Sequence, residues 1–289
     1  MFARVLGVRG PTLLARFLEE PGPPDQWGNR WQYNSRSDRH SKVGSWGVAF
    51  DLLRTSSCLR SHIADGKVVV GVNHTMTDFA TQRKKYLDLV IARPSGLVES
   101  GGPTFASLAD RYGIPLDDED RACLADLPPF PVAPVGAVLV ALEAKACMTA
   151  HIKSLPRLYD ELNSSHLCVH GASRQALAIG YVQVNLANEF ISSVKNNHDI
   201  SRFEPRVSRH RQPEDLQRVL AKVAEIPRRS HSSESGFDGL GVTVLDFRND
   251  GGPVRLVDQP PAPAPGDPFH YGSMIVRMAN EYDTVFKSI

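Results

Sequence analysis

The chain has 289 residues, of which 42% are hydrophobic and 22% are charged. This hydrophobic fraction can build a sizeable core, so a largely disordered chain is excluded, and the length corresponds to one large domain or two small ones. The formal charge is +1, with 33 Lys and Arg against 32 Asp and Glu. That balance excludes a histone-like basic coat, although local basic patches remain compatible with nucleic-acid binding.

The sequence contains no signal for a membrane or for secretion. No apolar run approaches the roughly 18 residues that a membrane-spanning helix needs. Residues 1–20 are amphipathic and lack a long apolar stretch before a small-residue cleavage site. The four cysteines are scattered without a Cys-x-x-Cys pair, which is typical of reduced thiols used in packing. We therefore expect a cytoplasmic protein without a membrane partner.

The N-terminal part of the chain is predicted to form helices separated by a loop. Residues 1–20 favour a short amphipathic helix that Gly10 and Pro11 interrupt. Residues 21–47 are rich in Pro and Gly and are expected to be loop, with aromatic residues between Arg and Lys. The stretch 48–63 follows as a helix.

Three apolar runs then have the length and composition of buried strands: 67–72, 86–92 and 137–146. Residues 93–136 form an insertion between the second and third runs and are expected to hold two short helices. Residues 152–162 repeat apolar side chains at helical spacing, so a helix should follow the third strand. Residues 176–185 are predicted to be a fourth strand.

The C-terminal part adds four predicted segments: a helix at 213–224, a strand pair at 240–247 and 254–257, a Pro/Ala-rich extended stretch at 259–268, and a helix at 269–287 with Met and Tyr on one face. The chain is thus predicted to comprise an N-terminal arm at 1–47, an α/β core at 48–200 that includes the insertion, and a C-terminal extension at 201–289. The last of these is a candidate for DNA binding or dimerisation.

Asp88 is the first candidate site residue because it interrupts the apolar run 86–91. An ionised carboxylate in a buried strand costs several kcal/mol unless it has a partner. Alternation along the strand also permits a simple alternative, in which one face is exposed and Asp88 is solvated. The residue alone does not separate these two interpretations.

Glu143 and Lys145 end the third apolar run, and in a strand they share one face, with backbones roughly 7 Å apart. Such a pair is either a structural ion pair or a metal and water site. Carboxylates are suited to Mg²⁺, which polarises a phosphoryl oxygen and activates water. The lysine can orient or deprotonate that water and stabilise phosphate charge, and the backbone carbonyl of Ala144 offers a further oxygen ligand.

An Asp on one strand, Glu-x-Lys on the next and a helix after it resemble the PD-(D/E)XK nuclease superfamily, the fold of many restriction endonucleases. The predicted order of elements over residues 48–186 is similar to the αβββαβ core of that family, although Leu87 stands where the family often has Pro. The resemblance implies an α/β protein with a mixed central sheet flanked by helices and with N- and C-terminal embellishments. It also implies catalysis by Asp88, Glu143 and Lys145, with Mg²⁺ held by the two acids and the Ala144 carbonyl.

The function implied by this resemblance is a Mg²⁺-dependent endonuclease that hydrolyses double-stranded DNA, of the type II restriction class. Such an enzyme needs no nucleotide cofactor. Cutting both strands with one site in each chain suggests a homodimer, whose two-fold axis matches a palindromic target. Two alternatives stay open: another nuclease of the same fold, acting in phage defence, repair or junction resolution, and a non-catalytic DNA-binding protein that retains the fold.

Further residues are weaker candidates. Asp51 is a candidate additional acid from the preceding helix, with Asp78 behind it, and Gln183 is expected to line the cleft. Phosphate or base contacts are predicted for three basic groups, each of which has a solvated charge cluster as the alternative. These groups are Arg83, Lys84 and Lys85; Arg36 and Arg39; and Arg202, Arg206, Arg209 and Arg211.

Two competing motifs are set aside. Asp65-Gly66-Lys67 is a second acid-x-Lys match, but Asp-Gly indicates a turn before the strand begins. His166 and His170 have the spacing of a metal pair on a helix. Gly171 and the β-favouring Cys168 and Val169 predict that the helix has already ended at this histidine pair.

Overall fold

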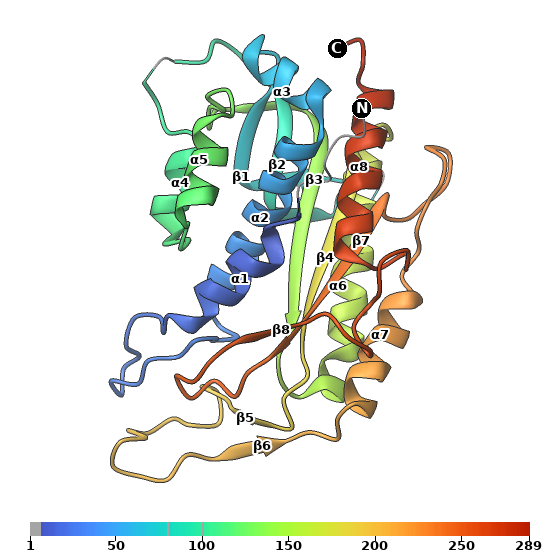
Figure 1. Cartoon of the computed structure of the whole chain (residues 1–289). Coiled ribbons are helices and arrows are strands. Elements are labelled where there is room, and N and C mark those ends of the chain that lie inside the picture. The colour runs from blue at the N-terminus through green and yellow to red at the C-terminus, as the bar shows by residue number, and fades with distance from the viewer. Residues whose placement is uncertain (1–6, 80, 100) are drawn as a thin grey trace.

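A mixed sheet lies at the centre of the computed structural model, which describes residues 7–79, 81–99 and 101–289, and helices cover both of its faces (Figure 1). Within those residues its strands are β1 (Val69–Thr77), β2 (Lys84–Pro94), β3 (Val135–Cys147), β4 (Leu177–Asn185), β7 (Gly239–Asp246) and β8 (Arg255–Val257), in the spatial order β1-β2-β3-β4-β7-β8. The first three strands are antiparallel neighbours, β3, β4 and β7 run parallel, and β8 returns antiparallel at the edge. The predicted α/β class with a mixed, helix-flanked sheet is confirmed.

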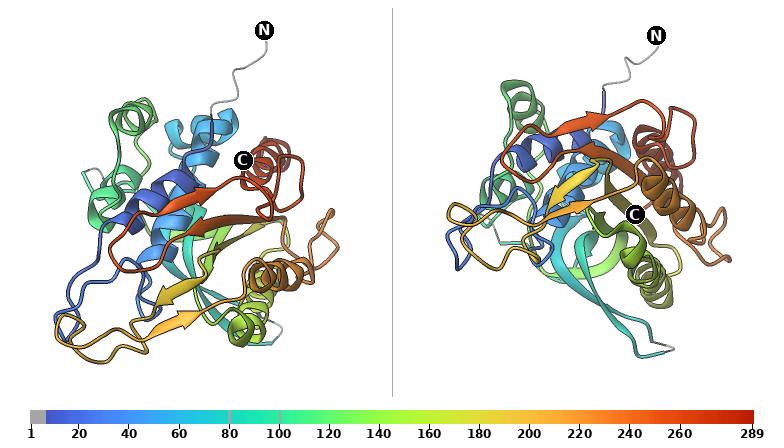
Figure 2. Two further views of the ribbon diagram at one scale, coloured as in Figure 1. Left: turned by 60° about the horizontal axis from the view of Figure 1, so that its bottom comes forward. Right: turned by 90° about the horizontal axis from the view of Figure 1, so that it is seen from below.

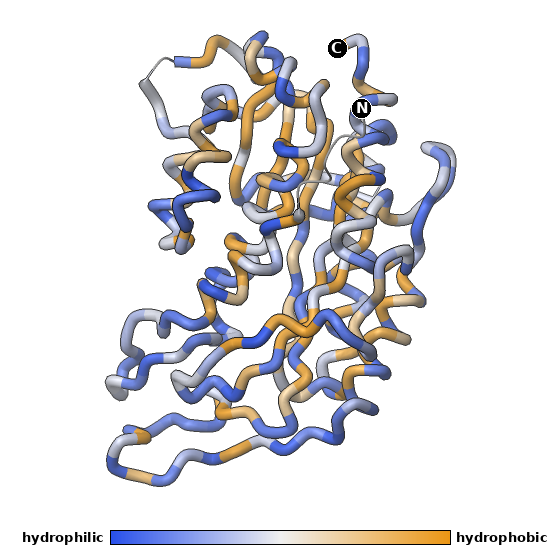
Figure 3. Tube along the Cα trace, in the orientation of Figure 1, coloured by the Kyte–Doolittle hydropathy of each residue, from blue (hydrophilic) through white to orange (hydrophobic). Residues whose placement is uncertain are grey.

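One face of the sheet is covered by α1 (Gly10–Glu19), α2 (Arg39–Thr55), α3 (Ser57–Ala64) and α8 (Tyr271–Val285), and the other by α6 (His151–Ala172) and α7 (Glu214–Ala224). Each layer buries its own hydrophobic cluster against the strands. The central strand β4 is buried at every position, as expected for a parallel strand with helices on both sides. Figure 3 shows hydrophobic residues concentrated along the strands.

The insertion carries α4 (Phe105–Tyr112) and α5 (Asp118–Ala125) and packs against the α2 layer. The buried indole of Trp46 lies between two rings, stacking on Phe105 with centroids 4.6 Å apart and on Phe50 with centroids 5.0 Å apart. Its Nε1 donates a hydrogen bond of 3.0 Å to the Phe105 carbonyl. The insertion therefore packs on α2 and stabilises its position through Phe105.

The predicted strands and the C-terminal helix agree with the structure to within a few residues, but the first helices do not. The helix expected at 48–63 begins nine residues earlier, at Arg39, and is interrupted at Ser56, whose Oγ accepts the N–H of Leu59 and caps α3. The glycines that suggested a loop are needed for close packing in α2. A Cβ on Gly44 would lie 2.3 Å from Nε2 of Gln183, and one on Gly47 would lie 2.9 Å from Cα of Gly10.

Other boundaries also move. Gly10 and Pro11 begin α1 rather than interrupting a helix, and the part of that prediction at residues 1–6 lies outside the described residues. The helix after β3 continues to Ala172, so the prediction that it ends before His166 and His170 is wrong. A short ribbon of β5 (Glu189–Ile191) and β6 (Val207–Arg209) was not predicted.

The predicted division into arm, core and extension is not seen in the sheet. The boundary between residues 47 and 48 falls inside α2, and segment 201–289 supplies β7 and β8 to the same sheet as β1 to β4. The apolar stripe of α8 is buried against its own chain, as Met274, Ile275 and Met278 show with exposures of 2%, 0% and 2%. This stripe is therefore not available as a dimer interface.

Two loops that are far apart in sequence, residues 21–38 and 192–206, lie side by side at one end of the molecule (Figure 2). Asn29 joins them, because its Nδ2 donates to the His198 carbonyl at 2.8 Å and its Oδ1 accepts from the Ile200 N–H at 3.1 Å. In the described part of the chain, no helix combines the length and the hydropathy required to cross a bilayer.

Candidate active site

The candidate site lies where β2 and β3 separate. Their pairing runs from Pro94 and Val135 to Leu89 and Leu142 and then stops, so the following residues of β3 have no ladder partner in β2. Asp88 sits at this fork, where its Oδ2 accepts the N–H of Ala144 at 2.9 Å. The Asp88 side chain therefore joins the two strands just beyond their last paired residues.

Asp88 is held from the α2 side. Its Oδ1 accepts a hydrogen bond of 3.1 Å from the Ser41 hydroxyl, and the Ser45 hydroxyl lies 3.5 Å from Oδ2. Burial raises the pKa of Asp88, and the Ala144 N–H, Lys145 and Ser41 oppose that rise without cancelling it. The residue is thus a half-buried acid with hydrogen-bond partners on α2 and β3, which does not fit the alternative of a freely solvated residue on an exposed strand face.

Glu143 is 3% exposed, and two lysine side chains lie close to its carboxylate. Lys145 Nζ lies 2.7 Å from its Oε1, and Lys85 Nζ lies 3.5 Å from the same oxygen. Its Oε2 is buried and has no hydrogen-bond partner among the described residues. Burial raises the pKa of Glu143, Asp88 raises it further, and the two lysines lower it in part.

The two carboxylates interact, since the charge of Asp88 acts on the pKa of Glu143, but their partners come from opposite layers. Asp88 is bound by serines of α2, whereas the lysines on Glu143 also contact Glu161 of α6. Asp88 is thus held from the α2 layer, and Glu143 is joined to the α6 layer through its lysines.

Lys145 connects β3 to α6. Its ammonium lies 3.3 Å from Oε2 of Glu161, whose Oε1 accepts from Arg157 at 2.5 Å. Burial would lower the pKa of Lys145, but Glu143 and Glu161 outweigh it and the pKa is raised. The amine is therefore protonated at neutral pH, which favours a role in orienting water and stabilising charge over one in removing a proton.

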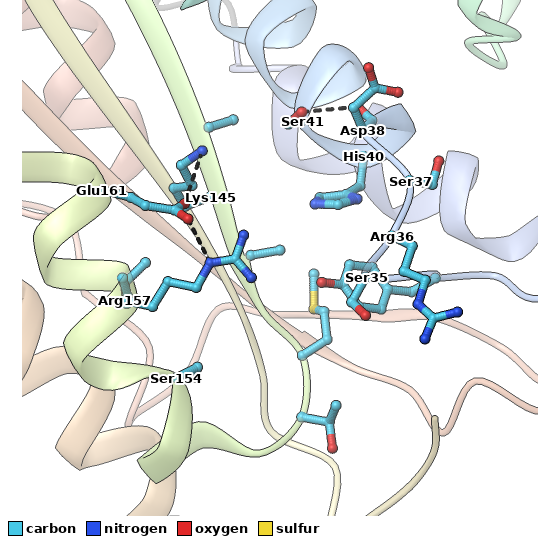
Figure 4. A pocket seen from close by; sticks show the side chains of 16 residues that line it. Ser35, Arg36, Ser37, Asp38, His40, Ser41, Lys145, Ser154, Arg157 and Glu161 are labelled. Atoms are coloured by element: carbon cyan, nitrogen blue, oxygen red, sulfur yellow. Dashed lines mark hydrogen bonds and ion pairs between the residues drawn. The ribbon is translucent and has the colours of Figure 1, made fainter. Parts of the chain in front are cut away.

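An open pocket of about 360 Å³ lies in front of this part of β3 (Figure 4). Lys145, Glu161 and Arg157 line one wall, and Asp38, His40 and Ser41 at the start of α2 face them across the space, with Arg36 further along the rim. Burial, assisted by the charge of Lys145, lowers the pKa of His40 to about 4, so its ring is neutral at pH 7. The pocket thus presents charged and hydroxyl groups beside the fork.

Asp51, the candidate additional acid, is not part of this site. Its buried carboxylate accepts the backbone N–H groups of Arg9 and Gly10 and the hydroxyl of Tyr271, and lies 3.3 Å from Arg54. It anchors the start of α1. Asp78 lies in the β1–β2 turn, where Thr81 Oγ1 donates to its Oδ2.

Gln183 lies beneath the pocket rather than in its lining. Its side chain is fully buried on β4, and Nε2 donates to the His40 carbonyl at 3.2 Å. Its Oε1 is buried and has no partner among the described residues. Gln183 therefore supports the start of α2.

The structure separates the predicted DNA-contact residues. Arg83 and Lys84 are exposed, whereas Lys85 turns toward Glu143. Arg36 lines the pocket, but the Arg39 guanidinium lies 4.8 Å from the ring centre of Phe17 and is used in packing. The C-terminal group is exposed beside the loop at 21–38, and three of its four members lie within 4 Å of an acid: Arg202, Arg209 and Arg211.

Sequence reasoning missed Glu161 and Arg157 and assigned Lys85 to a different role. An acid four residues after an arginine predicts a surface ion pair on a helix, and this pair is present. No local signal indicates that the same acid reaches Lys145 on β3. Only the packing of α6 against the sheet reveals it.

Among the described residues, no cluster of three or more His, Cys, Asp or Glu is arranged to hold a metal ion. His166 and His170 are on one helix, with ring centroids 6.2 Å apart, but His166 contacts Asn163 and His170 contacts Asp238. The chain matches no family model, and no curated protein or solved structure is significantly similar to it.

Proposed function

We propose that this chain is a Mg²⁺-dependent DNA endonuclease with a restriction-endonuclease-like core, most readily of the type II class. The observation that carries the proposal is that Asp88 bonds the backbone of Ala144 at the β2–β3 fork, while the flanking Glu143 and Lys145 form an ion pair beside an open polar pocket. The connectivity supports it as well. A helical layer, an antiparallel meander of β1 to β3, the helix α6 and the parallel strand β4 follow the αβββαβ order.

The donor set fits a hard divalent cation. Asp88, Glu143 and the carbonyl of Ala144 would hold it, and the buried Oε2 of Glu143 is an acceptor that still lacks a partner among the described residues. When bound, Mg²⁺ supplies a polarised phosphoryl oxygen and a water of lowered pKa. The rest of the chemistry belongs to the side chains of the pocket.

Lys145 provides the positive charge of the site. Held between Glu143 and Glu161, its ammonium is protonated and fixed at the pocket wall, where it can orient a water and stabilise the charge that develops on phosphate. The pocket rim adds Arg36 and Arg157, which suit the DNA backbone. In this proposal the partners are double-stranded DNA and a second copy of the chain.

The test is DNA scission by purified full-length protein, in Mg²⁺ or in EDTA, on linear plasmid and on branched DNA. We expect Mg²⁺-dependent cutting that Glu143→Gln and Lys145→Ala each reduce at least about 100-fold, the scale of a lost charge-stabilising group. Glu225→Gln and Lys222→Ala are matched controls, since they change an exposed ion pair of 2.6 Å at the end of α7.

Each outcome discriminates between interpretations. Discrete fragments support a restriction enzyme, whereas smears or junction cleavage indicate another nuclease of the same fold. DNA binding without scission on any substrate, with Lys145→Ala behaving like wild type, would contradict the nuclease and favour the non-catalytic alternative.

A further inference from the structure

Lys85 is the cation of this site that the proposed chemistry does not use. It lies near the start of β2, is 16% exposed, and its ammonium is 3.5 Å from Oε1 of Glu143 and 3.3 Å from the carbonyl of Glu161. Its neighbours Arg83 and Lys84 face solvent. A lysine from an otherwise exposed basic stretch is therefore turned inward onto the least exposed acid of the site.

The charges of the cluster already balance. Asp88, Glu143 and Glu161 supply three carboxylates, and Lys85, Lys145 and Arg157 supply three cations. A divalent cation at the buried Glu143 would add two positive charges to this balanced group. Beside a carboxylate that is only 3% exposed such an excess is unfavourable, so the departure of one resident cation would favour metal binding.

Among the three cations, Lys85 is the one that can leave. Lys145 is closer to Glu143, at 2.7 Å, and is held by a second carboxylate, that of Glu161. Arg157 does not contact Glu143, and its side chain is already 80% exposed. Lys85 has the longer ion pair, its other acceptor among the described residues is a backbone carbonyl, and it lies directly beside an exposed stretch.

We propose that Lys85 is a placeholder for the divalent cation: its ammonium neutralises Glu143 in the metal-free protein and is displaced toward solvent when the metal binds. The inference rests on the proposed function for its choice of cation. Displacement would place Lys85 beside Lys84 and Arg83, where the three form a basic group for DNA phosphate. Metal binding and DNA binding would then strengthen each other, because each favours the outward position of one side chain.

The experiment measures Mn²⁺ binding to full-length protein without DNA, by titration calorimetry at fixed pH and low salt. The variants are wild type, Lys85→Met, Lys85→Arg, Glu143→Gln and, as the matched control, Lys84→Met. We expect Lys85→Met to bind Mn²⁺ roughly tenfold more tightly than wild type, because a competing unit charge is gone. Lys85→Arg and Lys84→Met should stay near wild type, and Glu143→Gln should lose the site. Metal-free melting curves verify that each variant folds.

Two failures are distinguishable. If wild type binds Mn²⁺ at a site that Glu143→Gln removes, but folded Lys85→Met binds it no more tightly, the placeholder role is wrong and the nuclease proposal stands. If no folded variant binds Mn²⁺ at this site, the metal-dependent function is overturned, and the role of Lys85 falls with it.

Discussion

At the scale of single residues, two acids outside the candidate site, Asp51 and Asp238, are fully hydrogen-bonded, whereas Glu143 is not. Both carboxylate oxygens of Asp51 accept backbone N–H groups, and Asp238 accepts from Arg229 and from the Ala178 N–H. Glu143, equally buried, keeps one oxygen without a partner among the described residues. Buried polar groups are normally satisfied, and Asp215 is another buried acid with such an oxygen, so the free oxygen of Glu143 gains meaning only from the lysines and the pocket beside it.

The pair of Asp238 and Arg229 gives a prediction about stability. Asp238→Asn should lower the free energy of unfolding by about 3–5 kcal/mol, because it leaves the Arg229 guanidinium, 3% exposed, without its carboxylate. Urea unfolding at pH 7 measures this loss. Asp246→Asn is the control: it breaks the ion pair with the exposed Arg255 and should cost less than about 1 kcal/mol.

The same pair has a defined pH dependence. Burial raises the pKa of Asp238, but His170, Arg229 and the Ala178 N–H lower it by more, so the folded-state pKa is below the ordinary value of 3.8. The stabilisation is therefore complete above that value and is lost as the pH falls through the folded-state pKa. Wild type should lose unfolding free energy below about pH 4 more steeply than Asp238→Asn. Equal slopes would contradict this assignment.

The extent to which the site could be predicted depends on the range of the interactions. Glu143 and Lys145 were found because strand alternation is local and places them on one face. The inward turn of Lys85 and the reach of Glu161 depend on how β2 leaves β3 and how α6 packs, neither of which has a local signal. Asp51 shows the opposite error, since a helical acid near the motif has a purely structural role.

At the scale of elements, the strands were predicted well and the helix of the α2 layer was not. The six strands of the central sheet come from short apolar runs, whose length and β-branched content favour strands over helices. Helix α2 has glycines where Gln183 and Gly10 approach its backbone. In the sequence alone, these glycines predict a loop. Its helical state comes from packing that lies far away in sequence.

The insertion is joined to α1 by an ion network that gives a prediction for α4 and α5. Arg9 Nε lies 2.6 Å from Asp120, and Arg16 lies 3.0 Å from the same fully buried carboxylate. Asp120→Ala should leave both guanidinium groups without this partner and loosen the insertion. We expect amide hydrogen exchange to rise in 105–125 and to stay unchanged in β4. Glu119→Ala is the control, because Glu119 is 65% exposed. Unchanged exchange in α5 would contradict the role of this network.

At the scale of the whole molecule, two segments that are far apart in sequence form the surface near the pocket. Residues 21–38 and 192–206 form one joined, largely hydrophilic surface (Figures 2 and 3). Arg36 and Arg206 are exposed on it. Because this surface borders the pocket through Arg36, it is the natural place for the DNA backbone in the proposed function.

A substitution at Asn29 tests whether the two joined loops contribute together to DNA binding. Asn29→Ala removes both hydrogen bonds to the second loop, so amide exchange at 195–203 should increase. DNA affinity measured in Ca²⁺ should fall several-fold, because ordering the two loops would then cost free energy on binding. Asn197→Ala, in the same loop but outside this pair of bonds, is the control. Faster exchange with unchanged affinity would show that these loops do not touch DNA.

The bracing of α2 by the insertion has a practical consequence for protein engineering. The segment at 95–134 looks dispensable, because it joins the sheet at Pro94 and Val135, about 17 Å along the strands from the fork. Yet a trimmed chain would uncover the indole of Trp46 on the helix whose serines hold Asp88. A minimal version therefore needs a substitute for Phe105, or a polar residue in place of the tryptophan, before it is used to test the proposed function.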